Sequence, residues 1–233
     1  MLSRYRGLPC NSWLEEVISN LEVRFGVKTN AEKFVSFGEN EQLDGLQYLS
    51  RIIDATINKQ VLEIEYLTYD DVYHNHILHP YFVKQYNNRW FLFGLDDTEN
   101  RLKTLAFDRI KKFKKSVKAF RKNEVIDFSS YFDNVVGVTV PNNLNAQLET
   151  IELKFASRRF RYVISKPIHK SQQVKDVEKC IISLKLYPNR ELEQQIFSFG
   201  PDVEVLAPEW FRIQMIEKIS ENLKKYFPMQ NLC

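Results

Sequence analysis

Apolar positions in residues 1–60 recur three and four residues apart, which is the spacing of amphipathic helices. Asn11 and Ser12, followed by Glu15, form a capping-box start for a helix that should end near Gly26. A second apolar stripe follows, formed by Leu43, Leu46, Leu49, Ile52, Ile53 and Ile57. The pattern therefore predicts a helical segment of two helices over residues 1–60.

From Val61 the apolar period changes to two, as a half-buried β-strand requires. Further apolar runs follow between polar breaks at 87–88 and 96–100. These runs cover residues 77–86, 90–95 and 102–107, and the last continues into Ile110. Short sequential strands favour an SH3-like or OB-like barrel over an open sheet, because closure removes exposed edges. We assign this barrel to residues 61–122.

Residues 123–147 show weak periodicity and are predicted to connect the barrel to a second domain over residues 148–228. The predicted elements of this domain are strand 150–155, helix 157–165, strands 172–176 and 180–187, helix 190–198, strand 203–206 and helix 209–226. The order βαββαβα is that of a ferredoxin-like α+β unit. The whole chain is therefore predicted to be an α+β protein with a helical linker, a barrel and a ferredoxin-like domain.

Composition narrows the classes of function. The chain has 233 residues, which favours two domains, and only 7 glycines. No glycine-rich phosphate-binding motif occurs, so the classical nucleotide-binding folds are not expected. The net charge of +3 is too small to indicate nucleic-acid binding by itself, and only local basic clusters can support that function.

Cellular location and chemistry are also constrained. Cys10, Cys180 and Cys233 are odd in number and lack metal-ligand spacing, which favours a reducing compartment. No apolar run approaches the ~20 residues of a membrane span, and the N-terminus lacks the layout of a secretory signal. We therefore expect a cytoplasmic protein that does not contact a membrane. No paired carboxylates or catalytic triad stand at informative spacing, so neither an enzyme nor a cofactor is expected.

Three sequence blocks follow one another along the predicted barrel. They are His79-Pro80-Tyr81, Asn88-Arg89-Trp90-Phe91-Leu92 and Leu102-Lys103-Thr104-Leu105-Ala106-Phe107-Asp108-Arg109-Ile110. In order and spacing they resemble the WYL domain of bacterial transcriptional regulators, with Phe91 in place of the tyrosine of the naming tripeptide. Downstream, residues 165–172, 189–192 and 200–208 resemble the WCX extension that often follows WYL domains. Together the resemblance covers residues 61–226.

The resemblance implies a function. In that family a winged helix-turn-helix at the N-terminus usually binds DNA, and the Sm-like or SH3-like barrel senses an effector. Since the chain begins in what resembles the helical linker, we expect a truncation before Met1 that removes the DNA-binding domain. The chain would then be the effector-sensing half of a regulator, with an oligonucleotide or another anion as effector. A homodimer is implied too, and the apolar stripe of helix 209–226 supports it. The structural alternative for this stripe is core packing within the second domain.

Two alternatives belong to other classes. A stand-alone Sm-like protein would bind RNA or single-stranded DNA directly through the barrel. A metal-dependent hydrolase would use His74, His76 and His79, of which the first two share one strand face by their spacing. No carboxylate or cysteine at a recognisable interval completes a metal motif with them, so we expect no bound metal.

The resemblance also implies a ligand pocket. The corresponding positions are Tyr66, Thr68, His79, Tyr81, Lys103 and Arg109. A guanidinium grips phosphate bidentately, and aromatic or imidazole rings stack on bases. The structural alternative for Arg109 is an ion pair with Asp108 or another acid, and for His79 a turn-stabilising hydrogen bond. Trp90 is predicted to belong to the barrel core and not to the pocket.

Two basic clusters are candidates for a phosphate-binding groove. One consists of Lys111, Lys112 and Lys114, and the other of Arg158, Arg159 and Arg161. They would form one basic groove if the two domains face each other. The structural alternative is a solvated surface, where lysine also discourages pairing along a strand edge.

Overall fold

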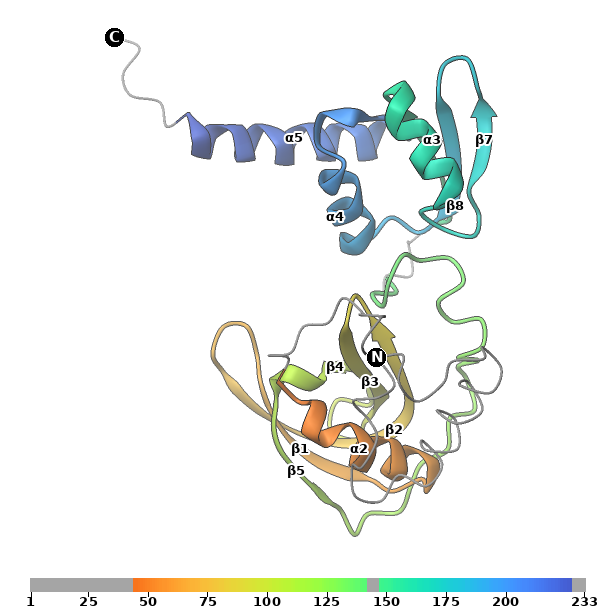
Figure 1. Ribbon diagram of the computed structural model, residues 1–233. Helices are drawn as coiled ribbons and strands as arrows, with labels where there is room; N and C mark the ends of the chain where they lie inside the picture. The colour runs from red at the N-terminus through yellow and green to blue at the C-terminus, as the bar shows by residue number, and fades with distance from the viewer. Residues whose placement is uncertain (1–43, 142–146, 228–233) are drawn as a thin grey trace, which may run out of the picture. The chain divides into compact units, whose positions relative to one another are not determined.

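A computed structural model describes residues 44–141 and 147–227 of the protein (Figure 1). These residues form two compact units, which divide between Val125 and Ile126. The helix predicted between Ser12 and Gly26 lies outside the described residues. None of the described helices is both long and apolar enough to cross a membrane.

The N-terminal unit is a helical segment followed by an antiparallel sheet. Its elements are η3 (Leu46–Tyr48), α2 (Leu49–Ile57), β1 (Leu62–Leu67), β2 (Tyr73–Tyr86), β3 (Arg89–Asp96), β4 (Arg101–Ala106), the 3₁₀ turn η4 (Phe107–Arg109) and β5 (Ile110–Lys115). The strand order is β4-β3-β2-β1-β5, and every pairing is antiparallel. These are the short sequential strands that the period-two pattern predicts.

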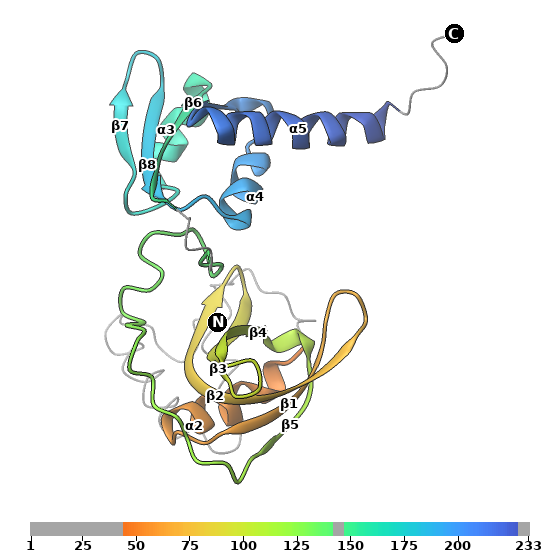
Figure 2. The ribbon, with the colours of Figure 1, turned by 180° about the vertical axis from the view of Figure 1, so that it is seen from behind.

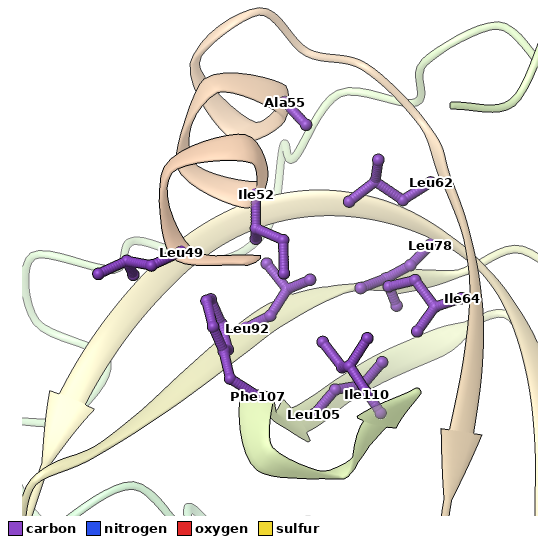
Figure 3. Close-up of a cluster of buried hydrophobic side chains, with 10 residues drawn as sticks. All are labelled: Leu49, Ile52, Ala55, Leu62, Ile64, Leu78, Leu92, Leu105, Phe107 and Ile110. Carbon is purple, nitrogen blue, oxygen red and sulfur yellow. The ribbon is translucent and has the colours of Figure 1, made fainter. Parts of the chain in front are cut away.

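The core of this unit lies between α2 and one face of the sheet, called here the inner face (Figure 3). Alternation along β1 turns Leu62 and Ile64 to the inner face, where each is at most 1% exposed. The cluster is completed by Leu49, Ile52, Ala55, Leu78, Leu92, Leu105, Phe107 and Ile110. Each fully buried leucine, isoleucine or phenylalanine side chain stabilises the fold by about 1.5–3 kcal/mol. Trp90 packs against this cluster, as predicted.

Strand β2 begins at Tyr73, four residues before the predicted strand 77–86. Residues 73–75 are exposed on both faces, so they lack the apolar alternation by which a sequence pattern detects a strand. The pairing with β3 slips between Pro80 and Phe82, and Tyr81 is the extra residue of this bulge. Beside the bulge, a Cβ on Gly94 would lie 2.5 Å from the carbonyl oxygen of His79, so only glycine fits there.

The C-terminal unit is ferredoxin-like (Figure 2). Its elements are β6 (Glu149–Phe155), α3 (Ser157–Ser165), β7 (Gln173–Asp176), β8 (Ile181–Leu186), α4 (Arg190–Ser198), η5 (Gly200–Asp202), β9 (Val203–Ala207) and α5 (Glu209–Tyr226). The antiparallel strands lie in the order β7-β8-β6-β9. The predicted order βαββαβα is confirmed, and the three helices have the predicted bounds.

Asn189 both starts α4 and anchors the chain that enters this unit. Its Oδ1 accepts the N–H of Leu192 at 2.9 Å, as an N-cap does. Its amide group donates to the carbonyl oxygens of Val136 at 2.7 Å and Thr139 at 2.9 Å. The residue is 7% exposed, so these bonds satisfy a buried polar group.

Candidate functional site

The inner face of the N-terminal sheet changes from apolar to polar towards the β1–β2 turn. Residues paired directly across antiparallel strands point to the same face. Leu62 pairs with Leu78, but the next inner pairs are Ile64 with His76 and Tyr66 with His74. From the other side, Asp96 pairs with Leu78 and therefore joins the same face. The strand registers thus gather two imidazoles, a phenol and a carboxylate at one end of the core.

His76 and Asp96 form a buried pair at this end. The Nδ1 of His76 lies 2.5 Å from Oδ2 of Asp96, and the residues are 7% and 0% exposed. The Oδ1 of Asp96 accepts the backbone N–H groups of Thr98 and Glu99, each at 2.9 Å. Asp96 therefore shapes the β3–β4 turn and orients His76 at the same time. The ring of His74 stacks on His76 with centroids 6.2 Å apart.

Glu99 and Lys103 lie beside this pair. Lys103 faces inward because it pairs with Gly94, and its Nζ lies 2.5 Å from Oε1 of Glu99. Arg101 donates from Nε to Oε2 of the same carboxylate at 2.5 Å. The hydrogen bond from Lys103 holds the pKa of Glu99 below its usual range; burial acts in the opposite direction, and a weaker hydrogen bond from Arg101 also lowers this pKa. The charge of Lys103 is therefore shared with a neighbouring acid.

A group of possible metal ligands exists among the described residues, but it differs from the trio His74, His76 and His79 considered as an alternative from the sequence. Ligand atoms of His76, Asp96 and Glu99 all lie within 4.8 Å of one another. The oxygens of Asp96 accept from His76 and two backbone N–H groups, and those of Glu99 accept from Lys103 and Arg101. This donor set fits an ion-pair network better than a metal site, because each carboxylate already has cationic or N–H partners. His79 belongs to the opposite face, since it pairs with Leu95.

Arg109 ends the turn η4 and is clamped by backbone carbonyls. Its Nε donates to the carbonyl oxygen of Leu67 at 2.7 Å, and its Nη2 donates to that of Thr68. Within the part of the chain that the structure describes, Arg109 has no carboxylate partner. Asp108, one of the acids considered as an ion-pair partner of Arg109, instead pairs with Arg89. The half-buried guanidinium therefore keeps a charge that no acid among the described residues neutralises.

Thr68 and Tyr66 support the same region. The hydroxyl of Thr68 donates to the carbonyl of Val72 at 3.2 Å and accepts its N–H at 3.3 Å, which closes the β1–β2 turn. The hydroxyl of Tyr66 accepts the N–H of Ala106 at 3.3 Å. Burial raises the pKa of Tyr66, so the phenol stays protonated and able to donate a hydrogen bond at neutral pH.

His79 and Tyr81 have a different role, because they bind the segment that follows β5. His79 is 1% exposed; its Nδ1 accepts the N–H of Arg121 at 3.0 Å, and its Nε2 lies 3.3 Å from Oδ1 of Asp97. The hydroxyl of Tyr81 donates to the carbonyl of Arg121 at 3.0 Å. Both rings contact the edge of Phe120, with centroids within 6 Å. The structure thus separates these two residues from Tyr66, Thr68, Lys103 and Arg109.

The predicted basic clusters lie in different units. On β5, Lys114 pairs with Glu63 at 2.8 Å, and Lys112 stands opposite Glu65. The hydroxyl of Tyr48 donates a hydrogen bond to the backbone carbonyl oxygen of Lys111 at 2.9 Å. These contacts are typical of a charged edge strand. On α3, Arg159 pairs with Asp202 at 3.1 Å, while Arg158 and Arg161 are exposed. A groove shared by both clusters stays a prediction.

Sequence patterns missed several residues of this region. Asp96 and Glu99 carry no motif, and their roles depend on the pairing of β2 with β3. Tyr69 and Arg89 were missed too: Nη2 of Arg89 donates to the hydroxyl of Tyr69 at 2.9 Å. The i, i+2 spacing of His74 and His76 was the available signal, and it correctly places both on one face.

Comparison with known proteins identifies the family. Residues 47–115 match the model of the WYL domain, and residues 147–223 match that of the WCX domain. No curated protein matches the chain. Among solved structures, proteasome accessory factor B/C of Arthrobacter aurescens is 13% identical with a TM-score of 0.33, over 81% of this chain and 28% of that one. A CRISPR Cas-related protein is 12% identical with a TM-score of 0.45, over 80% of this chain and 53% of that one.

The chain thus spans about half the length of one of these structures and less than a third of the other. Their titles describe those proteins, and similarity at this level carries no argument about function. The family assignment rests instead on two domain models, which match successive parts of the sequence and fall in the two structural units. The chain therefore contains a WYL domain in its N-terminal unit, followed by a WCX domain in its C-terminal unit.

Proposed function

We propose that this chain is the effector-sensing portion of a WYL-family transcriptional regulator, and that its effector is a nucleic-acid-derived or other anionic molecule. The observation that carries the proposal is the clamped guanidinium of Arg109, which carbonyl groups hold in place and no described acid neutralises. A guanidinium that is held in place and has no acidic partner favours anion binding, because the side chain loses little conformational entropy when the anion binds. Tyr66 on β1, Thr68 directly after β1 and Lys103 on β4 are the other residues of the proposed site.

Direct titration tests this proposal. We expect fluorescence anisotropy with short single-stranded DNA, RNA and cyclic oligonucleotides to reveal binding that weakens with salt, by about 0.7 in log affinity per log salt for each phosphate contact. Arg109→Ala should weaken binding by about 10- to 150-fold, since a hydrogen bond to a charged group contributes about 1.5–3 kcal/mol. Lys122→Ala, which also removes one positive charge but from an exposed position, is the control.

The outcomes distinguish the proposed functions. Equal binding by the parent protein and Arg109→Ala, with both folded by circular dichroism, would exclude this site. Binding by neither protein would exclude a nucleic-acid effector. A stand-alone Sm-like protein would instead bind RNA without a change in the C-terminal unit. Hydrogen exchange of α4 and α5 would then be the same with and without RNA.

We also propose that the regulator is a homodimer joined through α5. The helix exposes Ile213, Ile216, Ile219 and Leu223 at helical spacing, each by about half of its surface. Beside them runs an apolar groove of about 460 Å³ between α4, β9 and α5. The C-terminal half of α5 extends past the rest of its unit (Figures 1 and 2). An antiparallel helix pair centred between Ile219 and Ser220 would set Ile216 against Leu223 and Ile219 against Ser220.

Ile219→Glu should convert a concentration-dependent dimer into a monomer, because it buries a charge in the proposed helix pair. Size-exclusion chromatography with light scattering measures the change. The folded unit should persist, since Phe211 and Met215 are the buried residues of α5. Lys225→Glu, on the opposite side of the helix by its spacing, should remain a dimer. A parent protein that is monomeric at every concentration would contradict the proposal.

A further inference from the structure

The β1–β2 turn presents a large aromatic side chain to solvent. Tyr69 is 69% exposed, although it lies beside the half-buried Arg109. The turn that carries it is well defined: the N–H of Thr68 donates to the carbonyl of Val72 at 3.0 Å, and Asp71 has a φ of 57°. An exposed aromatic ring on a tight turn contributes little to the core, so its position calls for another explanation.

Tyr69 is held in place from one face and from its hydroxyl. The guanidinium carbon of Arg109 lies 4.2 Å from the ring centroid, a cation–π contact. The hydroxyl accepts a hydrogen bond from Nη2 of Arg89 at 2.9 Å. Arg89 is itself fixed by Asp108, at 2.9 Å to Oδ1 and 2.7 Å to Oδ2. An exposed side chain that is already ordered loses little conformational entropy when a ligand binds to it.

The guanidinium of Arg89 is stabilised in its charged form by this network. Burial alone would lower the pKa of Arg89, but hydrogen bonds to Asp108 and Tyr69 outweigh that effect and raise it. The two arginines and one aspartate leave a net positive charge around the ring. Within residues 44–141 and 147–227, Nη1 of neither arginine has a hydrogen-bond partner. Two N–H groups on each of these nitrogens remain for an anion.

The free face of Tyr69 and these nitrogens recognise two different chemical groups. Arg109 covers one face of the ring, and the exposed fraction leaves the other open. A planar aromatic group stacks on such a face, and a phosphate pairs with a guanidinium. Nucleotides join a planar base to a phosphate within a few ångströms. Base stacking on a tyrosine is tolerant of sequence, because every base has a π-face.

We propose that Tyr69 is a stacking platform for one base of a single-stranded oligonucleotide, with Arg89 and Arg109 contacting the adjoining phosphate. The inference rests on the anionic effector proposed above and adds a second recognised group, the base. It assigns binding roles to Tyr69 and Arg89, which the sequence blocks do not mark as ligand residues. It also gives the β1–β2 turn a function in effector recognition.

A comparison of base-bearing and base-free ligands tests the platform. The probe is a labelled oligothymidylate of about eight nucleotides, within the site size of single-strand-binding folds, and its fully abasic analogue. Tyr69→Ala should weaken binding of oligothymidylate by about 5- to 150-fold, the range expected for one stacked base, and leave binding of the abasic strand unchanged. Tyr69→Phe keeps the ring and should bind within about threefold of the parent.

Tyr73→Ala is the matched control, since Tyr73 is 61% exposed on the same hairpin. It should bind both strands like the parent protein. If the parent binds oligothymidylate and Tyr69→Ala loses nothing, or loses the same factor on both strands, the platform is excluded while the anionic-effector proposal stands. If the parent binds neither strand, both the oligonucleotide effector and the platform are excluded.

Discussion

Replacing Asp96 with alanine should lower the free energy of unfolding of the N-terminal unit by about 3–5 kcal/mol, because each buried polar group that loses its hydrogen-bond partner costs about 1–3 kcal/mol. The substitution removes the acceptor of His76 and of two backbone N–H groups in the β3–β4 turn. His76 is 7% exposed, so water cannot easily replace the lost partner. Urea unfolding followed by hydrogen exchange of β2 and β3 peptides would measure the loss separately from the C-terminal unit.

Two further variants serve as controls for Asp96→Ala. Asp70→Ala removes an exposed aspartate from the same unit and should change stability by less than about 0.5 kcal/mol. Asp96→Asn keeps an oxygen acceptor in the turn but removes the charge, so it should fall between the parent and Asp96→Ala. Stability of Asp96→Ala equal to that of Asp70→Ala would contradict the role assigned to the buried pair.

Phe107→Ala should destabilise the same unit by about 3–5 kcal/mol, because it leaves a cavity in the core. Phe107 is 1% exposed and anchors the turn η4, whose other members are Asp108 and Arg109. Gly45 packs so closely on this turn that a Cβ there would lie 2.3 Å from the carbonyl oxygen of Phe107. Loosening the turn should therefore weaken anion binding as well as stability.

Calorimetry and the anisotropy titration together measure both effects. Phe107→Leu retains most of the apolar volume and should lose about 1–1.5 kcal/mol, with binding close to that of the parent. Tyr73→Ala, an aromatic truncation at an exposed site, controls for the loss of a ring. A destabilised Phe107→Ala that binds oligonucleotide like the parent would show that η4 does not position Arg109.

Much of the fold could be predicted from the sequence. The helices of the C-terminal unit were predicted to the residue, because amphipathic stripes coincide with strong boundaries such as the Asn189 cap and Pro208. The start of β2 was missed, because exposed polar residues extend the hairpin without alternation. Local patterns thus determine helices well and polar strand ends poorly.

The site was harder to predict, because its contacts join residues far apart in the chain. Asp96 meets His76 only through the pairing of β2 with β3, and His79 meets Arg121 across 42 positions. No local pattern indicates such contacts. The family resemblance suggested Arg109, but not that backbone carbonyls hold its guanidinium. Its freedom from Asp108 follows from the competing pair with Arg89, which only the folded chain reveals.

The adjacent aspartates at the end of β3 have a consequence for folding. Asp96 meets His76 within the core, whereas Asp97 meets His79 on the other face of the sheet. If the 14-residue β2 aligned with β3 one position out of step, the two faces of β3 would exchange, so Asp97 would meet His76 and Asp96 would meet His79. Leu92 would leave the core, however, and a larger side chain would replace Gly94 beside the carbonyl oxygen of His79. Apolar burial and this close contact therefore select the register, while the two aspartates can pair with the histidines in either alignment.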